Sequence, residues 1–112
     1  ADTLLAPFSR FLPFAIGLAC CETVHRFGVA AALRWVNDVL VRQRKIAGIL
    51  CETHARGEER YHLIGIGLNV NLDGFPAHLQ QTATSLCLES GQAFDLEEVF
   101  LVLLARLQWN LG

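Results

Sequence analysis

Residues 33–71 read LRWVNDVLVRQRKIAGILCETHARGEERYHLIGIGLNVN. Apolar runs of strand length alternate here with short polar segments at 42–44 and 54–59, a pattern typical of antiparallel hairpins. The stretch therefore predicts a meander, with strands over 33–36, 39–41, 45–53 and 60–71. Asn37 and Asp38 interrupt the first two strands as a turn or bulge, because both side chains hydrogen-bond locally.

The last of these strands carries a small or amide side chain at every second position. Gly65, Gly67, Asn69 and Asn71 alternate with aliphatic residues. Period-2 alternation puts all of them on one face of the strand. Such a face has little to bury and lets another group approach the backbone closely. Spacing alone leaves two interpretations open: a ligand lies on this face, or a helix packs closely against it.

A helix is predicted before the meander. It begins near Ser9 or Arg10 and ends at Phe27, because Gly28 is a natural stop. Residues 4–6, ahead of this helix, are predicted to be the tail of a strand.

Two helices are predicted after the meander. Thr82 or Thr84 caps a short helix over 85–90, which Gly91 ends. Asp95 caps a last helix, in which apolar residues recur at i, i+3 and i+4. Together the elements predict an α+β fold, with helices packed on one face of a mainly antiparallel sheet.

Composition bounds the class of protein. The chain has 112 residues, enough for a single domain over 1–112, and 53% of them are hydrophobic, which excludes disorder. A net charge of −2 without a long basic cluster argues against DNA or RNA binding by this chain. Its four cysteines form no CxxC pair and its four histidines no ligand spacing, which argues against zinc. Without a signal peptide or a membrane-spanning apolar stretch, we expect a cytoplasmic protein.

Gly65 and Gly67 invite a dinucleotide-binding interpretation, which the neighbouring residues exclude. Val70 stands where the third glycine of that fingerprint belongs. Gly67 leads into more strand rather than into a helix, so no helix N-terminus is available to hold a pyrophosphate.

The polar residues of the meander are candidates for chemistry. Lys45 follows Arg44 and precedes the small residues Ala47 and Gly48, which leaves room for a ligand beside the ammonium. An exposed lysine at a strand end is also common without any function. The pair at 37–38 is likewise either a plain turn or an amide and a carboxylate facing a ligand.

Three motifs in this order resemble the catalytic domain of biotin–protein ligases. They are RWVND at 34–38, RKIAGIL at 44–50 and GIGLNVN at 65–71. The family pattern reads KWPND, a basic RK-[LI]-AGIL strand and a GxGxN strand. The similarity covers nearly all of residues 11–108 and includes FP at 75–76 and TATSL at 82–86. Three motifs with compatible gaps are far more specific than any one alone.

The resemblance implies a class II synthetase-like fold and a two-step activity. ATP activates biotin to biotinyl-5′-adenylate, and biotin then passes to a lysine of a carboxylase's biotin carrier domain. By matching position, Lys45 contacts the biotin carboxylate and the adenylate phosphate, where a fixed cation offsets the repulsion of two anions. Asp38 and Asn37 lie near the adenylate and its Mg²⁺, a metal that prefers oxygen ligands. Asp38 alternatively helps to deprotonate the acceptor lysine.

The same resemblance implies further substrate and nucleotide contacts. Asn69 contacts the nucleotide, and Arg44 belongs to the basic group that meets it. Gly48, Gly65 and Gly67 let the ligand lie directly against two neighbouring strands.

The sequence departs from the family pattern in two ways. Val36 replaces the usual proline and Arg34 the common lysine, and neither change removes a charge or a ligand group. Residues 1–32 contain no counterpart of the family's glycine/arginine loop or of its Ser/Thr-rich strand. We expect the SH3-like C-terminal domain, which is often present in the family, to be absent as well. We therefore expect a catalytic domain that is incomplete at its N-terminal side and has little activity alone.

Two alternatives stay open from the sequence. One is a non-catalytic remnant or interaction module, which keeps the fold for homodimerisation or carrier binding. Its long edge strand would favour pairing with another chain. The other is a relative of the lipoate or octanoyl transferases, which share the fold. The motifs at Trp35–Asp38 and Arg44–Leu50 resemble those enzymes less than they resemble biotin ligases.

Overall fold

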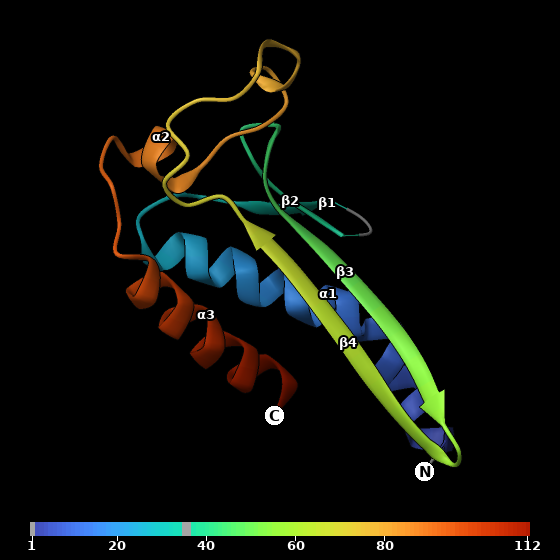
Figure 1. Cartoon of the computed structure of the whole chain (residues 1–112). Coiled ribbons are helices and arrows are strands. Elements are labelled where there is room, and N and C mark those ends of the chain that lie inside the picture. Colours follow the sequence, from blue (N-terminus) through green and yellow to red (C-terminus); the bar gives the residue numbers. More distant parts are fainter. Residues whose placement is uncertain (1, 35–36) are drawn as a thin grey trace.

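The computed structural model describes residues 2–34 and 37–112, with side chains described from residue 11 onward (Figure 1). The elements are α1 (Asp2–Arg26), β1 (Ala32–Arg34), β2 (Asp38–Val41), β3 (Arg44–Arg56), β4 (Glu59–Leu68), the 3-10 turn η1 (Ala77–Leu79), α2 (Leu86–Ser90) and α3 (Leu96–Leu111). Residues 35–36, predicted to end the first strand, lie outside the described residues. No helix in the described part of the chain has the length and apolar character needed to cross a bilayer.

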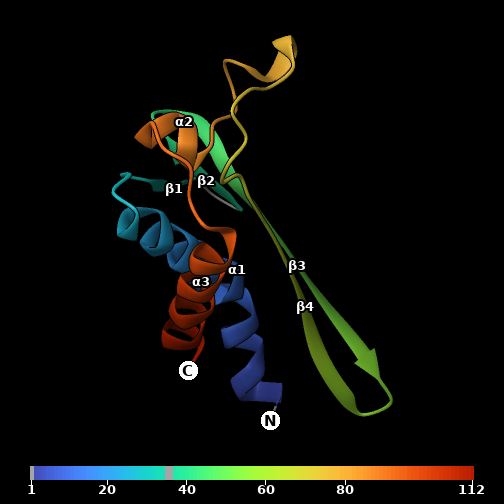
Figure 2. The same ribbon diagram turned by 60° about the vertical axis from the view of Figure 1, so that its left-hand side comes forward.

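The four strands form one antiparallel sheet in the order β1-β2-β3-β4, which confirms the predicted meander and the α+β class. Arg42 and Gln43 connect β2 to β3 with φ of 49° and 69°, the left-handed conformation that a two-residue hairpin turn requires. β3 and β4 form a long hairpin that extends well past β1 and β2 (Figures 1 and 2).

Two predicted strand limits in this hairpin are wrong. The polar turn at 54–59 shrinks to two residues around Gly57, because residues up to Arg56 pair with β4. The last strand ends at Leu68 rather than at Asn71. The Asn71 side chain instead bonds both main-chain groups of Phe94, at 2.7 and 2.9 Å, so it joins two loops and does not extend the glycine face.

α1 begins earlier than the sequence suggested. It starts at Asp2, so the strand predicted over 4–6 is wrong, because leucine and alanine there are strong helix formers. It ends at Arg26, one residue before the predicted Phe27, and Gly28 has a φ of +89°, a conformation that suits glycine.

Both long helices lie on the same side of the sheet (Figure 2). α1 packs directly against the strands, and α3 packs against α1. The core between them is aliphatic and includes Leu12, Ile16, Cys20, Val24, Val39, Val41, Ile46, Ala47, Ile49 and Val99. Neither α1 nor α3 covers the opposite face of β3 and β4, where Leu50 and Leu63 are exposed, so this face is accessible to a ligand (Figure 2).

A glycine sets the distance between α1 and the sheet. A Cβ on Gly17 would clash with Cδ2 of Leu33 and would lie 3.3 Å from Cδ1 of Ile49. The helix therefore approaches β1 and β3 more closely than any larger residue at this position permits.

The caps of the last two helices differ in how well the sequence predicted them. Asp95 caps α3 by accepting a hydrogen bond from the Glu97 N–H at 2.9 Å, as predicted. α2 is capped by Ser85, which accepts from the Leu88 N–H at 3.2 Å, and not by either of the two preceding threonines. Thr84 does not cap α2, because its N–H donates to Lys45 on β3 and its hydroxyl donates to Glu89.

Candidate functional site

A β-bulge turns Lys45 toward the open face of the sheet. In the β2–β3 ladder Val39 pairs with Ala47 and Leu40 with Lys45, so Ile46 has no partner on β2. Strict alternation would place Lys45 on the core side with Ala47. The extra residue moves the lysine to the other face, while Ile46 itself is fully buried.

The lysine side chain lies flat across Gly48. A Cβ at Gly48 would come within 3.0 Å of both Cε and Nζ of Lys45. Gly48 pairs with Gly67 on β4, where an added Cβ would meet no atom within 4 Å. The floor beneath the ammonium is therefore bare backbone contributed by two neighbouring strands.

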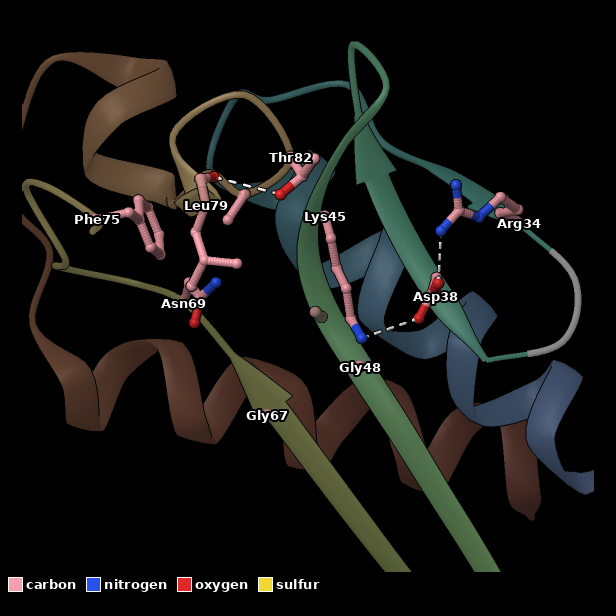
Figure 3. A pocket seen from close by; sticks show the side chains of 11 residues that line it. Arg34, Asp38, Lys45, Gly48, Gly67, Asn69, Phe75, Leu79 and Thr82 are labelled. Atoms are coloured by element: carbon pink, nitrogen blue, oxygen red, sulfur yellow. Dashed lines mark hydrogen bonds and ion pairs between the residues drawn. The ribbon is translucent and has the colours of Figure 1, made fainter. Parts of the chain in front are cut away.

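Asp38 holds the ammonium from one side. Its Oδ1 lies 3.1 Å from Lys45 Nζ, and its Oδ2 accepts a hydrogen bond from Arg34 at 2.8 Å (Figure 3). The bond from Arg34, followed by that from Lys45, lowers the pKa of the Asp38 carboxyl below its ordinary value. The carboxylate thus stays ionised and fixes the direction of the lysine.

The loop between β4 and α2 forms the opposite wall. The Lys45 N–H donates to the Thr82 carbonyl at 2.8 Å, and the Thr84 N–H donates to the Lys45 carbonyl at 2.9 Å. Phe75 and Leu79 lie on the same side as Asn69, away from the ion pairs (Figure 3). One end of the site is therefore charged and the other end apolar.

These groups enclose a cavity of about 630 Å³, within the usual range of small-molecule sites. It is lined by Arg34, Asp38, Lys45, Ala47, Gly48, Gly67, Asn69, Phe75, Leu79, Thr82 and Ala83. A charged group, a bare floor and an apolar end suit a ligand that joins an anion to a ring system.

Five of the residues singled out from the sequence meet at this cavity, namely Asp38, Lys45, Gly48, Gly67 and Asn69. Asn69 follows β4, and its side-chain amide donates to the Thr84 carbonyl at 3.1 Å. Their gathering follows from the register of β2, β3 and β4.

Three others lie outside the cavity lining. Arg44 lies instead near the Glu89 carboxylate. The positive charge of Arg44 helps to lower the pKa of Glu89. Gly65 pairs with Leu50, farther along the hairpin. Asn37 is exposed, and its carbonyl accepts from the Ile49 N–H at 2.9 Å.

The structure also adds residues that the polar pattern of the meander did not indicate. Arg34 reaches the cavity through its bond to Asp38, and Phe75, Leu79 and Thr82 come from the long loop. The only sequence signal for the loop was the resemblance of residues 75–76 and 82–86 to the family.

A protein-held metal ion fits this arrangement poorly. Both oxygens of Asp38 already face a cation, Lys45 on one side and Arg34 on the other. Within the described residues no cluster of three or more His, Cys, Asp or Glu side chains could hold a metal. Magnesium prefers oxygen ligands, and it is commonly held by few carboxylates together with substrate phosphates.

Comparison with known proteins assigns the family. Residues 9–71 match the Biotin/lipoate A/B protein ligase family. The chain therefore belongs to that family. The match confirms the biotin–protein ligase resemblance seen in the three motifs, because the relatives and solved structures to which the chain is similar include biotin ligases.

Two curated relatives and one solved structure illustrate the likeness. The chain is 42% identical over 98 residues to the biotin–[acetyl-CoA-carboxylase] ligase of Paracoccus denitrificans, covering 81% of this chain and 37% of the relative. It is 42% identical over 71 residues to the bifunctional ligase/repressor BirA of Bacillus spizizenii, covering 61% and 22%. The Aquifex aeolicus biotin protein ligase in complex with biotin and ATP superposes with a TM-score of 0.79 at 32% identity, covering 91% and 43%. The chain thus spans less than half the length of each.

Proposed function

We propose that this chain forms the part of a biotin–protein ligase that holds activated biotin. The reaction converts biotin and ATP to biotinyl-5′-adenylate and pyrophosphate. A lysine amine of a carrier domain then attacks the acyl carbon, which forms an amide with biotin and releases AMP. The observation that carries the proposal is the Lys45 ammonium, held by Asp38 over the bare floor of Gly48 and Gly67.

Lys45 acts on the charge that builds up in the first step. The biotin carboxylate attacks the α-phosphorus of ATP, which brings two anions together and releases pyrophosphate. A fixed ammonium between them offsets their repulsion and stabilises the charge that develops on the phosphoryl oxygens. The glycine floor lets the acyl phosphate lie within reach of the ammonium.

Asp38 orients Lys45 and is a poor general base. A base for the acceptor lysine would need a pKa near the working pH, whereas Arg34 and Lys45 lower the pKa of Asp38. Its carboxylate therefore serves to aim the ammonium, and Arg34 keeps it in place from the other side.

The apolar end of the cavity accommodates a ring. Phe75 and Leu79 supply apolar surface there, and Asn69 supplies a polar group beside them. We assign this end to the nucleoside and the charged end to the acyl phosphate.

The implied substrates are biotin, ATP and a biotin carrier protein. The Paracoccus denitrificans relative supports biotin and the carrier protein, since it is named a biotin–[acetyl-CoA-carboxylase] ligase. A solved structure of the Aquifex aeolicus ligase, which holds biotin and ATP, supports the two small substrates. Magnesium enters with the phosphates of ATP in this proposal, because Asp38 is already paired with two cations.

Calorimetric titration of the 112-residue chain with biotinyl-5′-adenylate tests the proposal. We expect binding by the wild type and at least tenfold weaker binding by Lys45→Ala. Arg56→Ala is the matched control, because it removes one positive charge from the exposed far end of the same strand. Equal affinity of Lys45→Ala and Arg56→Ala would refute the role of the lysine, and no heat with the wild type would favour a non-catalytic module.

A further inference from the structure

Lys45 lies where β3 loses its neighbour β4. The β3–β4 ladder begins at the pair Ala47 and Leu68, beyond the bulge. On that side, the main-chain groups of Lys45 are bonded instead by the loop, through Thr82 and Thr84. The loop therefore serves as a short substitute strand, and the position of the lysine depends on it.

Thr84 is the centre of this substitute strand. It is 1% exposed, its N–H bonds Lys45, and its carbonyl accepts from the Asn69 side chain at 3.1 Å. One residue thus bonds both a proposed anion-binding group and a proposed nucleotide contact.

The Thr84 hydroxyl donates to a nearly buried carboxylate. This group is Glu89 on α2, whose side chain is 7% exposed, and its other oxygen accepts from Arg42 at the β2–β3 turn. Burial raises the pKa of Glu89, but the bonds from Thr84 and Arg42 and the nearby charge of Arg44 more than offset it, so the pKa is lowered. The carboxylate stays charged and therefore accepts strong hydrogen bonds.

The hairpin turn between β2 and β3 brings the Arg42 side chain to this carboxylate. Arg42 and Gln43 both have positive φ, which is uncommon for residues with a side chain. Hydrogen bonds thus run from Arg42 through Glu89 to Thr84 and on to the backbone of Lys45, and they join two segments that are distant in sequence, residues 42–45 and 84–89.

We propose that Thr84 and Glu89 are positioning residues that hold Lys45 and Asn69 in the geometry needed for the acyl-adenylate. This inference rests on the proposed function. Neither side chain lines the cavity, so both act through the residues that do.

Amide hydrogen exchange of the chain tests the positioning directly. Thr84→Val removes the hydroxyl, and we expect exchange at the Lys45 and Thr84 amides to rise about tenfold. Thr84→Ser, which keeps the hydroxyl, should restore protection. The Ile49 amide, bonded to Asn37 on the other side of the same strand, should be unchanged in both. If the valine variant does not fold, Glu89→Gln provides the same readout, since a neutral amide accepts more weakly. Unchanged protection at Lys45 in a folded variant would overturn the inference.

A thermodynamic cycle on biotinyl-5′-adenylate affinity then separates this inference from the proposed function. We expect Thr84→Val to weaken binding about tenfold in the wild-type background and by a clearly smaller factor in Lys45→Ala, because the effect through the lysine is then lost and only the effect through Asn69 remains. Equal factors in the two backgrounds would overturn the positioning role but leave the proposed function intact. An affinity that Lys45→Ala leaves unchanged would overturn the proposed function itself.

Discussion

Replacing Gly48 with alanine should weaken ligand binding without weakening the fold. Gly48 lies inside β3 and its φ is not positive, so alanine fits its backbone. By restricting the unfolded chain, such a change stabilises by about 0.4–1 kcal/mol. The new methyl would, however, lie 3.0 Å from both Cε and Nζ of Lys45.

The size of the effect follows from how far the ammonium must move. Carbon atoms in contact prefer separations of about 3.5–4.0 Å, so Nζ is displaced by about 0.5–1 Å. At an effective dielectric constant of about 20, moving a charge pair from about 4 to about 5 Å lowers the attraction from about 4 to about 3 kcal/mol. A broken hydrogen bond to a charged group adds about 1.5–3 kcal/mol. Together these losses predict an affinity at least tenfold weaker, since tenfold corresponds to about 1.4 kcal/mol.

Titration calorimetry with biotinyl-5′-adenylate and urea unfolding measure the two effects separately. Gly65→Ala is the matched control: its Cβ would lie on the same face of the hairpin at an ordinary 3.5 Å from Leu50 Cβ, outside the cavity lining. We expect Gly65→Ala to bind as the wild type does. Wild-type affinity in Gly48→Ala would refute the position assigned to the lysine, and lost affinity with an equal loss of stability would show general misfolding.

Three further predictions concern catalysis, pH and packing. In a complete ligase that contains this segment, Lys45→Ala should slow adenylate formation at least a hundredfold, measured by pyrophosphate release. A variant that forms the adenylate at the wild-type rate would contradict the role assigned to Lys45. The pKa of Asp38 is lower in the folded protein than the ordinary value of 3.8, so the unfolded state binds a proton more readily. The ion pairs of Asp38 therefore stabilise the fold fully above pH 3.8, and this stabilisation is lost as the pH falls through the native pKa. The unfolding free energies of wild type and Asp38→Asn should therefore differ by a constant amount above about pH 5, less than about 1 kcal/mol for partly exposed pairs, and converge in acid. Gly17→Ala should lower the free energy of unfolding by about 1 kcal/mol. Overpacking against Leu33 costs about 1–3 kcal/mol, and the higher helix propensity of alanine offsets about 1 kcal/mol of it. A more stable variant would argue against the close packing of α1.

Features set by neighbouring residues could be predicted from the sequence. The meander follows from apolar runs and polar turns, and the caps at Gly28, Gly91 and Asp95 follow from their own chemistry. The glycine pair at 48 and 67 could also be placed on facing strands, since the hairpin connects them directly.

Features set by distant contacts could not be predicted. The bulge at Ile46 leaves no trace in an unbroken apolar run, yet it decides which face Lys45 occupies. The pairing of Lys45 with Thr82 and Thr84 joins segments almost forty residues apart in sequence, across a loop without periodicity. The cap of α2 is a second example. Thr82 and Thr84 are suitable cap residues by type, but both bond Lys45 on β3, and Ser85 caps the helix.

Lys45 is the only lysine in the sequence, so labelling the chain with ¹⁵N-lysine yields a single side-chain ammonium signal by NMR. The most direct measurement follows this signal while biotinyl-5′-adenylate is added, with adenosine as the uncharged comparison. If Lys45 binds the acyl phosphate, its signal should shift saturably with the adenylate and change little with adenosine. A Lys45 signal that stays in place while the adenylate binds would contradict that role of the lysine.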